Sequence, residues 1–179
     1  MVAPARPPAS PFSTGHSTAF AGNADFHRCL CDLLDAAQSE VADYVIPETR
    51  PDEHDQFILR AYGNANRRGV VCRSLIAPHH LNLVQSTWEP NFDMRTFLQK
   101  FRHIRVIDQV HGPFTVVDRR KVLLNVEDAF DPGTYTTSVV VEDERLAESL
   151  LQTFDQLWDE AGRQQDALIS AWEASRAGK

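Results

Sequence analysis

The apolar positions of this chain switch between helical and strand spacing from residue 25 onward. Residues 25–37 and 52–65 carry apolar side chains three and four positions apart, which is typical of helices that bury one face. Each segment is followed by a short apolar run, at 41–46 and 70–76, with the composition of a buried strand. This order and the short connections predict a β–α–β unit with parallel strands.

The second half of the chain predicts a hairpin and a closing helix. Residues 92–101 have the spacing of a short helix, and 104–107 that of a strand. Branched and aromatic residues at 114–117 and 122–124 flank a charged turn at 118–121, which indicates a β-hairpin. A further strand is expected at 134–141. The last helix begins near Asp143 and has a dense apolar stripe up to Gly162; its continuation to Trp172 is left open.

Three regions follow from this pattern. Residues 1–22 hold four prolines and no apolar period, so we expect a disordered or loosely docked arm. Residues 23–162 form one α/β domain, with a mixed β-sheet flanked by helices. Residues 163–179 are a C-terminal helical extension or tail. The 179 residues suffice for one domain with a real core.

Composition narrows the function classes. The net charge of −7 offers no global attraction for nucleic acid, and we interpret the short basic runs at 67–68 and 119–121 as solvated turns. Three cysteines do not suggest a disulfide framework. No apolar stretch reaches the length of a membrane span, so a cytoplasmic protein is expected. His79 and His80 are adjacent and lack further ligands at metal-site spacing, so neither a metal nor a cofactor is predicted.

Candidate site residues surround the predicted hairpin and the first strand. His111 and Asp118 stand at its mouth, where either could contact a ligand or simply satisfy the turn. Glu48 and Arg50 follow the first strand, whose carboxyl end faces the crevice where open α/β sheets bind ligands; exposed loop is the alternative. Arg73, in a buried strand, either pairs with a carboxylate or points to the pocket.

The hairpin stretch resembles the phospholipase D superfamily, taken as a single half-unit. That family's signature is His, any residue, Lys, four residues, Asp, six residues, Gly-Ser, any residue, Asn. His111 and Asp118 keep the spacing, Pro113 stands at the lysine, and residues 125–128 stand at the Gly-Ser-any-Asn segment. The closing Phe154–Trp158 spacing is also similar to that family, and the resemblance covers roughly residues 26–161.

The resemblance implies a degenerate site. In these enzymes the histidine attacks phosphorus and the lysine binds phosphoryl oxygens. Proline has neither a donor nor a charge, and losing one such donor costs about 10²–10³-fold in rate. Val126 and Asp128 replace the Ser and Asn, and Glu127 and Asp128 would repel a phosphodiester. The sequence of the hairpin also resembles that of the effector-binding domain of TrmB-type helix-turn-helix transcription regulators. Those domains bind small ligands or transmit a signal through a dimer.

We therefore expect a non-catalytic ligand-sensing or signalling domain related to such effector domains. The expected ligand-binding residues are His111, Asp118, Glu48, Arg50, Arg73 and Asp128. The expected partners are a small-molecule ligand, a second copy of the chain and a protein that supplies DNA binding, since no DNA-binding helix pair is present here and no direct nucleic-acid binding is predicted.

Two alternatives remain. One is a dimeric phosphodiesterase or nuclease with His111 as nucleophile and Asp118 in its site. The other is a homodimeric interaction domain built on the closing helix and the tail around Trp172.

Overall fold

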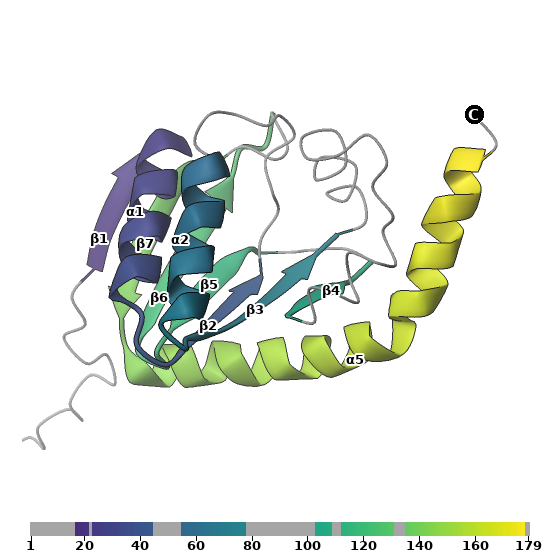
Figure 1. Cartoon of the computed structure of the whole chain (residues 1–179). Helices are drawn as coiled ribbons and strands as arrows, with labels where there is room; N and C mark the ends of the chain where they lie inside the picture. Colours follow the sequence, from purple (N-terminus) through teal and green to yellow (C-terminus); the bar gives the residue numbers. More distant parts are fainter. Residues whose placement is uncertain are drawn as a thin grey trace, which may run out of the picture.

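A computed structural model describes residues 17–21, 23–44, 55–77, 103–108, 112–130 and 135–177. Its centre is a mixed seven-stranded sheet with the order β1-β7-β6-β5-β2-β3-β4. Helices α1 and α2 cover one face of this sheet, and α5 crosses the other (Figure 1). The expected α/β architecture, a mixed sheet flanked by helices, is confirmed.

The elements have the following bounds. The strands are β1 (Ser17–Ala21), β2 (Glu40–Tyr44), β3 (Val71–Ile76), β4 (Ile104–Val106), β5 (Phe114–Val117), β6 (Lys121–Glu127) and β7 (Tyr135–Glu142). The helices are α1 (Asn23–Ala36), α2 (Asp55–Arg67) and α5 (Glu144–Ala177).

Strands β2, β3 and β4 are parallel neighbours, and α2 connects the first two. The predicted β–α–β unit is thus confirmed. β5 runs antiparallel to β2, so it begins where these three strands finish. We call this edge the carboxyl end of the sheet, and the opposite edge, where β2 begins and β5 turns into β6, the amino end.

The predicted hairpin is also confirmed, with β5 and β6 antiparallel around residues 118–120. Asp118 and Arg119 both have positive φ, at 52° and 55°. Two consecutive residues in this region form the tight turn that matches the twist of paired strands, although Asn-Gly fits it with less strain. Other contacts must therefore hold this turn.

Two apolar cores sandwich the sheet. Under α1 and α2 the core is built from Phe26, Leu30, Leu33, Leu34, Val41, Cys72, Val117 and Leu123, among others. Under α5 it is built from Ala42, Leu75, Val116, Val122, Leu151, Phe154 and Trp158, among others. Successive residues of a strand point to opposite faces, which is why Val41 and Ala42 belong to different cores.

The structure differs from the sequence-based expectation near the N-terminus. Residues 17–21 were expected in the disordered arm, but they form β1, which pairs antiparallel with β7 from Ser17↔Val141 to Ala21↔Thr137. The pairing with an existing strand supplies hydrogen bonds that local composition does not reveal. The predicted helix at 92–101 lies outside the described residues.

Helix α5 continues well beyond Gly162, to Ala177. Its path bends, and the yellow C-terminal part turns away from the sheet (Figure 1). Arg105 of β4 donates to the backbone oxygen of Trp158, and its guanidinium lies 4.4 Å from that ring's centroid. A side chain that donates a hydrogen bond to a backbone carbonyl within a helix is a recognised cause of helix bending. No helix in the described ranges is long and apolar enough to cross a membrane.

Candidate functional site

A buried carboxylate lies in the sheet, on the face covered by α1 and α2. Asp43 of β2 is 3% exposed and accepts hydrogen bonds from Thr115 Oγ1 of β5, at 2.7 Å, and from Tyr62 Oη of α2. Burial raises the pKa of Asp43 from 3.8 to about 6, although both hydrogen bonds act to lower it. A buried acid that titrates this close to neutrality is more frequent at functional sites than elsewhere.

Tyr62 connects this carboxylate to β3. Its hydroxyl is also hydrogen-bonded to Ser74, the residue that pairs with Asp43 in the β2–β3 register. Burial raises the pKa of Tyr62, and the neighbouring Asp43 raises it further. The phenol therefore stays neutral near pH 7. We call Asp43, Tyr62, Ser74 and Thr115 the Asp43 cluster.

A second buried polar pair lies on the same face, closer to the carboxyl end. Ser138 Oγ of β7 donates to Asn125 Oδ1 of β6 at 2.8 Å, and Asn125 is 7% exposed. Asn125 Nδ2 is buried and has no hydrogen-bond partner among the described residues. The backbone N–H of Asn125 donates to Pro113 O at 3.2 Å, which places the pair beside the start of β5. Buried donors without partners are rare in folded proteins, so this pair marks an unusual site.

Asp118, a predicted ligand residue, lies at the amino end of the sheet. Its carboxylate accepts the backbone N–H groups of Gln38, Ser39 and Glu40 at 2.8–3.2 Å, and also the Ser39 hydroxyl. Burial acts to raise the pKa of Asp118, but these hydrogen bonds outweigh it and the net shift is downward. Of the two roles considered for Asp118, this geometry supports the turn former, because the carboxylate holds the α1–β2 loop.

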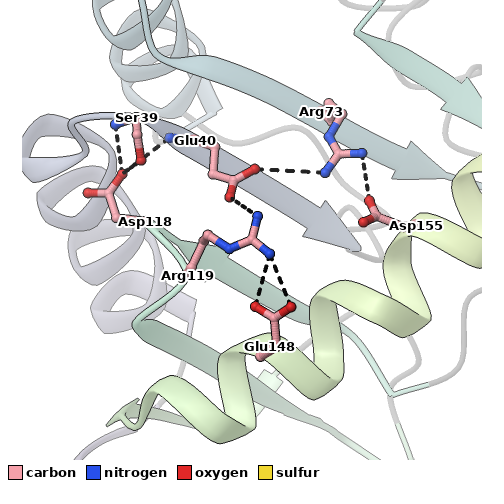
Figure 2. A network of polar contacts seen from close by, with 7 residues as sticks. All are labelled: Ser39, Glu40, Arg73, Asp118, Arg119, Glu148 and Asp155. Carbon is pink, nitrogen blue, oxygen red and sulfur yellow. Dashed lines mark hydrogen bonds and ion pairs between the residues drawn. The ribbon is translucent and has the colours of Figure 1, made fainter.

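Arg73 also lies at the amino end, in a network of ion pairs that Figure 2 shows. Its guanidinium is 2.7 Å from Asp155 of α5 and 3.9 Å from Glu40. Glu40 in turn pairs with Arg119 of the hairpin turn at 3.2 Å, and Arg119 reaches Glu148 of α5 at 2.9 Å. Of the two roles considered for Arg73, pairing with a carboxylate is the observed one. The network joins α5, β2, β3 and the turn.

Asp128 forms a local turn after β6. Its Oδ1 accepts the backbone N–H of Phe130 at 2.8 Å, the spacing of an Asx-turn. Phe130 itself is 98% exposed. The Asx-turn by itself explains why an aspartate stands at position 128, whether or not a ligand binds there.

The other three predicted site residues, His111, Glu48 and Arg50, lie outside the described residues. Of the three described site residues, Asp118 and Arg73 lie at the amino end of the sheet, whereas Asp128 follows the end of β6 at the carboxyl end. These three residues therefore do not form one cluster.

Sequence reasoning missed Asp43 and its partners. The available signal was a single acid inside the apolar run at 41–46. An acid in that position requires hydrogen-bond donors. The donors come from residues 62 and 115, and their approach depends on tertiary packing that no local pattern reveals.

The described cysteines do not form a reactive or metal-binding group. Burial raises the pKa of both Cys29 and Cys72 to about 11, with smaller contributions from neighbouring aspartates. Within the described ranges, no three His, Cys, Asp or Glu side chains gather closely enough to hold a metal ion.

Several solved structures have folds similar to that of this chain. The archaeal chromatin protein TrmBL2, reported with a novel mode of DNA binding, matches with a TM-score of 0.59 and 18% identity; the match covers 81% of this chain and 53% of that one. Nuc from Salmonella typhimurium, a phospholipase D family member, matches at 0.55 and 16%, covering 81% and 95%. NucT from Helicobacter pylori matches at 0.56 and 11%, covering 81% and 96%.

These similarities establish a phospholipase D-like fold. The chain spans about half the length of TrmBL2 and nearly all of Nuc. No curated protein sequence matches. A family model described as "Domain of unknown function (DUF7436)" matches residues 17–163, from β1 into α5, and the chain therefore belongs to that family.

Proposed function

We propose that this domain binds a small-molecule ligand at the carboxyl end of the sheet and signals its presence without chemical turnover. The observation that supports this best is the environment of Pro113. It is buried at the start of β5, and its carbonyl accepts the N–H of Asn125. The phospholipase D resemblance places a phosphate-binding lysine at this position, and proline offers no cation.

The neighbouring described groups do not replace the missing charge. Among the described strand residues of this face, the buried polar side chains are Asp43, Thr115, Asn125 and Ser138, and none of them is basic. A phosphodiester needs cations or several N–H donors. This lining supports ligand binding over phosphodiester cleavage.

The proposal assigns the ligand contacts to His111, Glu48 and Arg50. In sequence, His111 directly precedes Gly112, and Glu48 and Arg50 follow Tyr44 by four and six positions. Tyr44 and Gly112 lie at the carboxyl end of the sheet, where open α/β sheets bind ligands. Asp118, Arg73 and Asp128 are given a supporting role instead, since each is engaged in the contacts described above.

A thermal-shift screen of sugars, sugar phosphates and nucleotides tests the proposal. A ligand at about one hundred times its dissociation constant stabilises the folded state by about 2.7 kcal/mol, which raises Tm by about 5–10 °C in a protein of this size. We expect His111→Ala to abolish the shift and Asp159→Asn, on the exposed side of α5, to retain it. Absence of a shift with every class would contradict the proposal.

The signal is proposed to pass to a second copy of the chain or to a partner that binds DNA. The structural similarity to TrmBL2 supports this, because that protein combines a similar domain with DNA binding. Light scattering at high protein concentration tests self-association, and a mass corresponding to one copy would exclude the homodimer.

The enzyme alternative is supported by the similarity to Nuc, which extends over 95% of that chain. On that reading a dimer hydrolyses a phosphodiester with His111 as nucleophile. Turnover of bis-nitrophenyl phosphate that disappears in His111→Ala would favour the enzyme over the sensor.

A further inference from the structure

Helix α2 is held to the sheet by apolar side chains and by a polar anchor. Among the α2 side chains that the structure describes, Ala61 and Ala65 are buried, Ile58 and Tyr62 pack partly buried against the same core, and Phe57 is 54% exposed. Alanine itself buries little apolar area, so the polar anchor is a substantial part of what fixes this helix. The anchor is Tyr62, whose hydroxyl donates to Asp43.

Within the part of the chain that the structure describes, the anchoring carboxylate of Asp43 has no counter-ion. Tyr62 from α2 and Thr115 from β5 hydrogen-bond Asp43, and Ser74 of β3 hydrogen-bonds Tyr62. Asp43 raises the pKa of Cys72 of β3, and Arg68, which lowers it, donates to the backbone oxygens of Leu34 and Ala37. Tyr62 and Cys72 have raised pKa values and remain neutral between pH 5 and 8. Among the described residues, no arginine, lysine or histidine contacts this carboxylate.

A buried anion without a counter-ion favours any motion that admits water, whereas the neutral acid does not. We propose that Asp43 is a proton-operated latch: with the proton bound, α2 is closed on the sheet, and ionisation of the carboxylate loosens α2. This goes beyond ligand binding, because it gives the domain a response to pH on the α2 side of the sheet.

The size of the response follows from linkage. The opened state exposes Asp43 to water and restores its ordinary pKa of 3.8, against about 6 in the closed state. The ratio of opened to closed α2 should therefore rise about tenfold between pH 5 and pH 8. Above pH 8 it should level off, because the carboxylate is then ionised in both states.

Hydrogen exchange of the α2 backbone amides, corrected for the intrinsic pH dependence of exchange, measures this ratio in the full chain. We expect the tenfold rise in the α2 amides and not in those of α1 or α5. Asp43→Asn keeps one oxygen that can accept a hydrogen bond from Tyr62 but cannot ionise, so its ratio of opened to closed α2 should be constant with pH. A flat wild-type profile, or an equal rise in all three helices, would refute the latch.

Tyr62→Phe provides a second, independent variant. It removes the anchor and leaves the apolar ring, so the α2 amides should exchange at least several-fold faster at every pH while those of α1 are unchanged. If Asp43→Asn does not fold, this variant still decides the matter, since unchanged α2 exchange in Tyr62→Phe would show that the anchor does not hold the helix.

Discussion

Asp118 Oδ1 accepts the backbone N–H of Ser39 at 2.8 Å, although the two residues are 79 positions apart in the chain. The hairpin turn thereby fixes the loop from which β2 starts. Asp118 adopts a positive φ of 52°, which costs energy for any residue other than glycine and is better tolerated by aspartate and asparagine. The turn and the loop stabilise one another.

Asp118→Asn tests this relationship, because asparagine tolerates the same backbone conformation but carries no charge. Hydrogen bonds to a charged acceptor are stronger than those to a neutral one, so we expect a loss of about 1–2 kcal/mol in the free energy of unfolding. Urea denaturation at pH 7 measures it. Asp32→Asn, an exposed aspartate on α1, is the matched control and should change little. Equal stability of the two variants would argue against the clamp.

The turn also shows what the sequence could and could not predict. A charged turn between two apolar runs predicted the hairpin, and an aspartate within it was correctly considered as a turn former. Its partners at residues 38–40 were not predictable, because they approach only when β2 and β5 pair. Arg73 is similar: pairing with an acid was foreseen, but not which acid, since Asp155 lies 82 positions away.

The pH dependence of the free energy of unfolding should reveal the ionisation of Asp43. Its folded pKa of about 6 is above the unfolded value of 3.8, so the native state binds the proton more tightly. The associated stabilisation is complete below pH 3.8 and is lost as the pH rises through 6. Asp43→Asn cannot ionise and therefore does not lose this stabilisation. Between pH 4 and pH 7 the free energy of unfolding of the variant should rise by about 2–3 kcal/mol relative to that of the wild type. Denaturation series at both pH values measure the difference.

The contribution of Asp118 to stability depends on pH in the opposite direction to that of Asp43, so Asp118 provides an internal comparison. Its pKa is lowered in the folded state, so its contribution is present above pH 3.8 and is lost as the pH falls through the folded pKa. Asp118→Asn should therefore approach the wild type in stability under acid conditions, while Asp43→Asn departs from it at neutral pH. A parallel pH profile for both variants would contradict this assignment.

The ion pair between Arg73 and Asp155 should contribute modestly, and mainly at low salt. Asp155 is 56% exposed, which allows solvent to screen the pair. We expect Asp155→Asn to lose about 0.5–1 kcal/mol at low ionic strength and less in 1 M salt. Asp159→Asn, one turn further along the exposed side of α5, should show neither the loss nor the salt dependence. Identical behaviour of the two variants would show that the ion pair adds nothing to stability.

Two helical glycines should respond in opposite ways to alanine. In an exposed helix interior this change stabilises by about 0.5–1 kcal/mol, because glycine loses more backbone entropy on folding. Gly63 of α2 has open space around an added Cβ, so Gly63→Ala should show that gain. At Gly162 of α5 the added Cβ would lie 2.7 Å from an Arg105 guanidinium nitrogen, so Arg105 must move off Trp158. Gly162→Ala should therefore gain nothing or lose stability in thermal denaturation, and an equal gain at both positions would show that Arg105 shifts without cost.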